Sequence, residues 1–389
     1  MGKISLSELQ KSYLVGRKLK KNLGGVPCHA YFEFEGEEID INNFKRAWEV
    51  VKKDHIMIHS SFLEDGEIKR EESIDKSLFV FNLSNLEEKE SQEILLDCRE
   101  NISHRAMDIT RGQAIGCEVF LLKGNKTRIC FDVDLACTDV YGIQEILNEL
   151  GSRLANKDLK ERNYKLESKE SFIQQTLKSK EREEILIKQE TKLPYGDNAQ
   201  SLYNCQYASL DYKFSKEEFE KLSVLYKDKL FAQMLKSLWD TSKQENMLVN
   251  IPYFLKEKEG YDFVADNTKV FWMKLNKACA STEAIDEIVK KRLLEEKKDY
   301  KLENGLVPLV FSYNQNGIFL NDDFVNNIGK LTYMISQTPN VCLDVQLFNM
   351  LDGLLVSFVY PKEISGLENI KTWFEDFISK VKELINNGD

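Results

Sequence analysis

The residues of this chain that most suggest chemistry are two aspartates, Asp134 and Asp139, which lie five positions apart. Before them, from Ile129 to Val133, apolar and polar residues alternate, which predicts a half-buried strand. After them, apolar residues recur at helical spacing from Ile143 onward, and Asp139 is placed to cap the first turn of that helix. Two carboxylates at such a junction could form a reaction centre. The spacing is also compatible with a helix cap at Asp139 and a solvated strand end at Asp134, and alone it does not decide.

Both halves of the chain alternate strand-like and helix-like segments, which predicts layers of an α/β (α+β) fold. With 389 residues the chain is too long for one ordinary core, so we expect an N-terminal lobe at 1–165 and a C-terminal lobe at 166–389. Residues 156–190, which are almost all charged or polar, are expected to form a helix-rich connector. The other predicted elements are helices at 6–19, 43–53, 214–235, 282–299 and 367–385, strands at 29–36, 247–254, 307–312 and 354–359, and a turn at 64–66.

Composition argues against several classes of function. The net charge of −10 disfavours nucleic-acid binding, which needs a basic face, and the short basic cluster at 17–21 is too small to change this. No apolar run approaches the length of a membrane span or a signal peptide, so we expect no membrane association. The eight cysteines lack a Cys-x-x-Cys pair and the four histidines lack zinc-site spacing, so we expect neither disulfides nor a metal. These features predict a cytoplasmic protein.

Several motifs, in the correct order over nearly the whole chain, resemble those of the heterocyclisation domains of nonribosomal peptide synthetases. These domains are a branch of the condensation-domain superfamily, whose lobes are like chloramphenicol acetyltransferase. The spacing of Asp134 and Asp139 is the hallmark of this branch, where ordinary condensation domains carry a His-His pair, and the resemblance favours a functional aspartate pair. The other motifs are residues 6–17 (Leu-Ser-Glu-Leu-Gln-Lys-Ser-Tyr-Leu-Val-Gly-Arg), 24–29 (Gly-Gly-Val-Pro-Cys-His), 102–105 (Ile-Ser-His-Arg), 265–268 (Ala-Asp-Asn-Thr), 307–312 (Val-Pro-Leu-Val-Phe-Ser) and 336–344 (Ser-Gln-Thr-Pro-Asn-Val-Cys-Leu-Asp).

The resemblance implies a V-shaped pair of lobes with a tunnel at their seam. Donor and acceptor peptidyl carrier proteins would dock at the two mouths, each presenting an acyl group on phosphopantetheine, and the chain itself would bind no cofactor. The amine of carrier-bound Cys, Ser or Thr would attack the upstream thioester to form an amide. The side-chain thiol or hydroxyl would then attack the amide carbonyl, and loss of water would give a thiazoline or oxazoline. We expect a monomer or a part of a larger synthetase, and the first motif, close to Met1, favours a compact stand-alone chain or a trimmed piece.

The matched motifs also imply which residues carry the chemistry. Cyclodehydration takes a proton from the nucleophile and delivers one to the departing hydroxyl, and one carboxyl group can do both if burial raises its pKa toward neutrality. Asp344 stands where the family's general acid/base lies, and Ser312 stands where the family has a threonine that can donate to the carbonyl oxygen. Gln337 could orient either partner, while Thr338 and Pro339 are expected to shape the turn. A turn aspartate at 344 and a strand serine at 312 are the structural alternatives.

The resemblance implies different roles for the two aspartates. Asp134 is expected to face the tunnel, where it could hold the attacking amine. Asp139 is expected to be mainly structural. We also place Arg17, which ends the opening motif, among the structural residues of the site.

Three positions depart from the family pattern: Gly142 replaces a serine, His59 an arginine and Val359 an aspartate. If that arginine clamps the aspartate loop, the shorter and partly charged His59 would weaken the clamp. The departures weigh more against condensation than against cyclodehydration, and they leave a second hypothesis open, a carrier-protein docking platform without turnover. A tunnel lined by Asp134 and Asp344 would favour the enzyme, and a tunnel plugged by side chains would favour the platform. An acyltransferase with a histidine base is disfavoured, because the chain has no His-His-x-x-x-Asp run.

Overall fold

The structure is a computed structural model, and it describes residues 4–71, 78–157, 183–187, 193–226, 229–242, 244–254, 264–277, 298–302, 305–314 and 317–386. No helix among these residues is long and apolar enough to cross a membrane. The elements of the first half are β1 (Ile4–Ser5), α1 (Glu8–Gly16), β2 (His29–Glu37), α2 (Ile41–Asp54), η1 (Ile56–His59), β3 (Ser60–Phe62), β4 (Glu67–Arg70), β5 (Phe79–Asn82), α3 (Glu88–Ile102), η2 (Ile109–Arg111), β6 (Ile115–Leu122), β7 (Lys126–Asp134) and α4 (Val140–Leu154).

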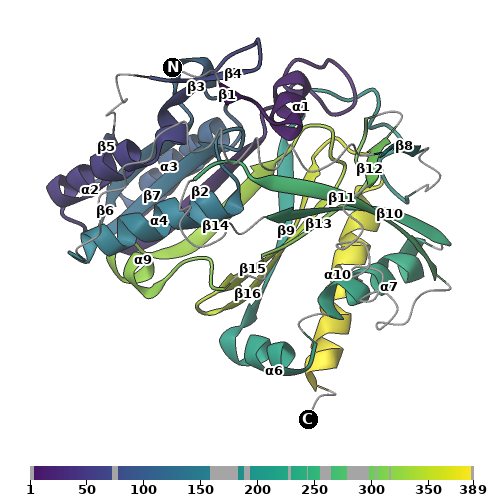
Figure 1. The fold of residues 1–389 in the computed structure, drawn as a ribbon. Helices are drawn as coiled ribbons and strands as arrows, with labels where there is room; N and C mark the ends of the chain where they lie inside the picture. The colour runs from purple at the N-terminus through teal and green to yellow at the C-terminus, as the bar shows by residue number, and fades with distance from the viewer. Residues whose placement is uncertain are drawn as a thin grey trace.

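The elements of the second half follow the same alternation of strands and helices (Figure 1). They are β8 (Glu183–Ile187), β9 (Tyr207–Ser215), α6 (Lys216–Tyr226), α7 (Leu230–Ser242), β10 (Asn246–Phe254), β11 (Thr268–Asn276), β12 (Lys298–Leu302), β13 (Val310–Asn314), α9 (Asp322–Asn327), β14 (Lys330–Gln337), β15 (Asp344–Met350), β16 (Gly353–Pro361) and α10 (Leu367–Asn386). Two small sheets, β1-β4-β3 and β12-β8, accompany the two large ones described next.

The first large sheet has five strands in the order β14-β2-β7-β6-β5. Helices α2 and α4 cover one face, and α3 covers the other (Figure 1). Asp40 begins α2 by accepting hydrogen bonds from two backbone N–H groups, and Phe44, Trp48 and Val51 then fall on one buried face. The Trp48 ring packs edge-on against Phe131 of β7 with ring centroids 5.5 Å apart. Alternation along β2 and β7 therefore gives the sheet one apolar face, beneath these helices.

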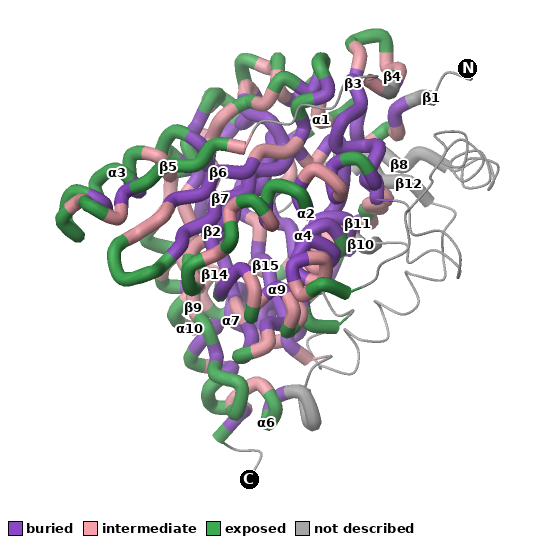
Figure 2. The backbone as a smooth tube through the Cα atoms, turned by 90° about the vertical axis from the view of Figure 1, so that its left-hand side faces the viewer, coloured by how far each residue is buried: buried purple, intermediate pink, exposed green. Residues whose placement is uncertain are grey.

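The second large sheet has six strands in the order β11-β10-β13-β15-β16-β9. Its central strands β10, β13 and β15 run parallel, and α7 and α10 pack together beside the sheet (Figure 1). Trp373 of α10 is buried and donates a hydrogen bond from its indole nitrogen to the carbonyl of Met234 in α7 (3.3 Å). In Figure 2 the strands of both sheets are mostly buried, and exposure is concentrated in outer helices and loops. The mixed α/β layers predicted from sequence are confirmed.

One strand of the second half belongs to the sheet of the first half. Strand β14 pairs with β2 along residues 330–337, and α9, which precedes it, packs against α4. The chain then returns to the second sheet through β15, which begins after only six intervening residues. The predicted lobe boundaries, 1–165 and 166–389, stay a prediction, but the edge of the first sheet is supplied from beyond residue 165.

The local patterns located several elements well. The predicted helices at 43–53 and 367–385 and the predicted strand at 29–36 match α2, α10 and β2. The predicted helix at 214–235 is wrong in its extent: β9 continues to Ser215, and α6 and α7 are separate helices. Most of the predicted connector at 156–190 and of the helix at 282–299 lies outside the described residues, and the described stretch 183–187 of the connector is a strand.

Candidate functional site

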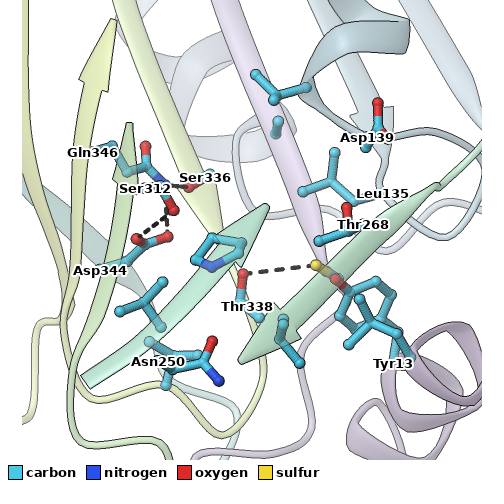
Figure 3. A pocket seen from close by; sticks show the side chains of 18 of the residues that line it. Tyr13, Leu135, Asp139, Asn250, Thr268, Ser312, Ser336, Thr338, Asp344 and Gln346 are labelled. Atoms are coloured by element: carbon cyan, nitrogen blue, oxygen red, sulfur yellow. Dashed lines mark hydrogen bonds between the residues drawn. The ribbon is translucent and has the colours of Figure 1, made fainter. Parts of the chain in front are cut away.

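A cavity of about 350 Å³ lies between the two large sheets. Its walls come from α1, β2 and the loop after β7 in the first half, and from β10, β11, β13 and β15 in the second. Strand β14, which joins the first sheet, also lines it. Figure 3 shows the polar side chains of the two halves facing each other across this space. Two of the predicted catalytic residues, Asp344 and Ser312, line this cavity.

Asp344, the first residue of β15, lies on the cavity wall within a small polar group. The hydroxyl of Ser312 donates to its Oδ1 (3.4 Å), and the amide of Gln346 donates to its Oδ2 (2.7 Å). The same amide donates to the hydroxyl of Ser336 on β14 (2.7 Å), which ties the two sheets together (Figure 3). Burial raises the pKa of Asp344 to about 6, and the two donors oppose that rise. The carboxyl can thus change protonation state near neutral pH.

Gln337 does not lie beside Asp344, contrary to its predicted role. Ser336 on β14 and Thr338, directly after the strand, line the cavity, and the intervening Gln337 points to the opposite face of the sheet. There its Oε1 lies 3.1 Å from Nδ1 of His104. The amide that contacts Asp344 belongs to Gln346, two residues further along β15. Side chains two residues apart on a strand point to the same face of the sheet, so Gln346 lies on the same face as Asp344.

Asp134 is fully buried and is not among the lining residues, so the prediction that it faces the tunnel is wrong. Its Oδ2 pairs with the guanidinium of Arg17, which follows α1, and its Oδ1 accepts from the backbone N–H of Ala136 (3.0 Å). In register, Asp134 stands opposite His29 and His29 opposite Gln337, so all three belong to the sheet face turned away from the cavity. Arg17 holds the first aspartate, as a structural residue would.

Asp139 is the member of the pair that lines the cavity. It caps α4, since its Oδ1 accepts from the backbone N–H of Gly142 (3.0 Å). Its Oδ2 accepts from the backbone N–H of Asn267 in the second half (3.0 Å). Burial raises the pKa of Asp139, and the backbone donors oppose that rise. The residue expected to be structural therefore joins the two halves and also presents a carboxylate to the cavity.

The three departures from the family pattern now have physical settings. His59 is buried in η1, where its carbonyl accepts from the N–H of Glu71 (3.4 Å), and the aspartate loop is held by Arg17 instead. The expectation of a clamp weakened at His59 stays a prediction. Val359 is buried in β16 directly across from Asp344, so an aspartate there would place a second carboxylate beside it.

Gly142 is required by close approach in the first turn of α4. A Cβ at this position would collide with the hydroxyl of Thr138 and lie 2.9 Å from Val264. We expect Gly142→Ser to lower the free energy of unfolding by about 1–3 kcal/mol, because overpacking forces the neighbours to move. Urea denaturation of Gly142→Ser and of Gly142→Ser/Thr138→Ala tests this. Recovery in the double variant supports the steric cause, and equal losses in both would contradict it.

Other cavity residues were not singled out from sequence. Asn250 on β10 is 7% exposed and points its amide into the cavity (Figure 3). At the other end, the thiol of Cys28 lies 3.6 Å from the hydroxyl of Thr338, close to Tyr13. The carbonyl of Thr338 also accepts from the hydroxyl of Tyr207 (3.1 Å), which suits its predicted role in shaping the turn. Strand periodicity on β2 and β10 was the available signal, but the cavity-facing register needed the partner strands.

In the part of the chain that the structure describes, no group of three or more His, Cys, Asp or Glu side chains could hold a metal ion. The described cavity lining instead offers carboxylates, hydroxyls and amides, which suit proton transfer and hydrogen bonding to a bound carbonyl.

The sequence of the chain is similar to those of two known synthetases. No family model matches the chain. Pyochelin synthetase PchE of Pseudomonas aeruginosa is 24% identical over 440 residues, and phenyloxazoline synthase MbtB of Mycobacterium tuberculosis is 23% identical over 428 residues. These alignments cover 98% and 99% of this chain but only 29% and 30% of the two relatives. The chain thus spans under a third of the length of these relatives.

Among solved structures, the EpoB cyclization-docking bidomain of Sorangium cellulosum superposes with a TM-score of 0.80 at 18% identity, covering 98% of this chain and 85% of that one. The first condensation domain of the calcium-dependent antibiotic synthetase gives 0.71 at 14% identity, covering 99% and 96%. The fold is therefore that of the condensation-type domains of peptide synthetases. The resemblance in the motifs is confirmed: in sequence the chain is similar to nonribosomal peptide synthetases over nearly its whole length, and it has the fold of their condensation and cyclization domains.

Proposed function

We propose that this chain catalyses heterocyclisation on carrier-bound substrates. An acyl thioester on a donor peptidyl carrier protein is joined to carrier-bound Cys, Ser or Thr, and the resulting amide is cyclised and dehydrated to a thiazoline or oxazoline. The observation that carries the proposal is Asp344, a carboxyl with a pKa of about 6 on the cavity wall, hydrogen-bonded to Ser312 and Gln346. Two relatives support it by name, a pyochelin synthetase and a phenyloxazoline synthase.

In the proposed cycle Asp344 moves protons in two directions. As the carboxylate it accepts the proton of the attacking thiol or hydroxyl, which forms a tetrahedral adduct at the amide carbon. As the carboxylic acid it passes that proton to the oxyanion of the adduct, which becomes a hydroxyl. It then takes the proton of the former amide nitrogen and delivers it to this hydroxyl, which leaves as water as the C=N bond forms. Ser312, whose hydroxyl reaches Asp344, can donate to the carbonyl oxygen as charge develops there. A pKa near neutrality serves both steps, because neither protonation state is then rare.

The first half supports the condensation step less directly. The proposed holder of the attacking amine, Asp134, is bound by Arg17 and faces away from the cavity. Asp139 is the first-half carboxylate within reach of a substrate amine. The cavity is not filled by side chains and Asp344 lines it, which supports the enzyme. The burial of Asp134 outside the lining supports the alternative of a docking platform without turnover.

Intact-protein mass spectrometry of the carriers tests the function. One carrier is loaded with a simple acyl group and the other with cysteine, and the full chain is added. We expect a product lighter than the linear amide by one water. Linear amide alone would reduce the chain to a condensation catalyst. Absence of any product, with both carriers still binding, would favour the docking platform.

A further inference from the structure

The charged side chains that line the cavity are all of one sign. Three carboxylates face it: Asp139, Asp266 and Asp344. Among the described lining residues there is no lysine, arginine or histidine. The guanidinium of Arg17 is committed to Asp134, which lies outside the lining. A ligand anion in this cavity would therefore meet like charges and no described cation.

The pKa values of the ionisable groups that line the cavity indicate that it disfavours negative charge. Burial raises the pKa of Tyr13 well above its ordinary value and that of Cys28 to about 12. The carboxylates of Asp266 and Asp139 raise the pKa of Tyr13 further. The pKa values of Asp139 and Asp344 are raised by burial as well. In each case the cavity favours the uncharged form of an acid, because desolvation penalises the anion.

Apart from its hydroxyl and amide side chains, the rest of the described wall is apolar and partly aromatic. Phe32 of β2, Trp272 of β11 and Phe348 of β15 line it, together with Met334 and Leu347. Such surfaces bind an apolar or aryl body through area removed from water. A cavity of about 350 Å³ has room for an acyl group of that kind.

We propose that the cavity selects its acyl donor by charge, admitting a neutral acyl group with an apolar body and rejecting one that carries a carboxylate. The inference rests on the proposed function for the statement that the ligand is an acyl group linked to pantetheine. It goes beyond that function by naming the class of donor. The carboxylates of Asp139 and Asp266, which line the cavity and act electrostatically on Tyr13, carry the repulsion.

Binding of two matched ligands to the full chain tests the proposal without needing turnover. The ligands are the non-hydrolysable amides of aminopantetheine with 4-carbamoylbenzoic acid and with terephthalic acid, which have nearly the same shape but differ in charge. At pH 8 we expect the carboxylate ligand to bind about 100-fold more weakly by calorimetry, the effect of roughly two pKa units of desolvation. As the pH falls toward 5 the ligand carboxyl becomes protonated and the difference should narrow. Affinities within threefold at pH 8, or no binding of the neutral ligand, would overturn the proposal.

Two variants assign the effect to the cavity. Asp266→Asn removes a lining charge but keeps the oxygen that accepts from the N–H of Thr268. It should narrow the difference in affinity between the neutral and the carboxylate ligand. Asp97→Asn removes an exposed charge from α3, outside the cavity lining, and should leave the difference unchanged. Equal narrowing by both variants would trace the effect to net charge and overturn selection by the cavity. If the ligands differ as expected while loaded carriers yield no heterocycle, the proposed function fails and charge selection stands.

Discussion

Replacing Asp344 with asparagine is expected to slow heterocycle formation by about 100-fold or more, the usual loss when a general acid/base is removed. Linear amide should still accumulate, because the amide-forming step does not require this carboxyl in the proposed cycle. Asparagine keeps the shape, and its single oxygen can still accept from either Ser312 or Gln346, but it cannot carry the proton. Time courses of linear and cyclised carrier product, resolved by mass spectrometry, measure both steps.

The pH dependence provides a second signature of the same residue. With a raised pKa of about 6, Asp344 is protonated below that pH and ionised above it. When proton removal from the nucleophile limits the rate, cyclodehydration by the unaltered chain should rise with pH through about 6 and then level. The Asp344→Asn variant should lack this inflection. A variant that cyclises at the unaltered rate, or keeps the inflection, would remove Asp344 from the mechanism.

Stability measurements separate lost chemistry from lost folding. Because the folded pKa of Asp344 lies above the ordinary value near 4, the folded chain binds the proton more tightly than the unfolded chain. The unaltered chain therefore loses stability as pH rises from about 4 to 6, and that loss persists above pH 6. Asp344→Asn should be more stable at pH 8 by roughly 2–3 kcal/mol, with little difference near pH 4. The exposed Asp97→Asn serves as the control, which should change stability at neither pH.

Replacing Arg17 with methionine is expected to lower the free energy of unfolding by roughly 3–5 kcal/mol. The substitution keeps most of the aliphatic stem but leaves the fully buried Asp134 without its cation. A buried carboxylate that loses its partner is either unpaired or forced to take up a proton, and both states weaken the fold. Urea denaturation followed by circular dichroism gives the change directly.

A companion variant identifies the cause of that loss. In Arg17→Met/Asp134→Asn the buried charge is gone, and the amide oxygen can still accept from the N–H of Ala136. We expect this double variant to regain a large part of the lost stability. An Arg17→Met variant within 1 kcal/mol of the unaltered chain would show that the ion pair is not needed to hold the aspartate loop.

Sequence patterns predicted those features of this fold that depend on neighbours along the chain. The cap of α4 at Asp139 was predicted because a short polar side chain before a helical run accepts from the first-turn N–H groups, and that bond is present. The strand at β2 and the helix at α2 likewise follow from local periodicity. The order of the motifs led to the resemblance to heterocyclisation domains, which the similarity to peptide synthetases in sequence and in fold confirms.

The directions of the site residues depended on partners that no local pattern reveals. Asp134 and Gln337 lie on the same face of one sheet because β14 and β7 flank β2 in a register that sets both opposite His29. A shift of one residue in the pairing of β7 with β2 would have turned Asp134 toward the cavity, and the same shift in the pairing of β14 with β2 would have turned Gln337. Gln346 was missed for a related reason: its role depends on Ser336, which reaches it from the other sheet.

The crossing of β14 gives the site a mechanical property. Ser336 on β14, and Thr338 directly after that strand, are attached to the sheet of the first half, whereas Asp344 and Gln346 belong to the sheet of the second half. A rotation of one sheet against the other would therefore separate the Ser336 hydroxyl from the Gln346 amide while leaving Ser312 beside Asp344. The polar group around Asp344 is complete only when the two halves are closed on each other. Opening the seam to release a product would thus disassemble part of the site, and closing it on the next substrate would rebuild it.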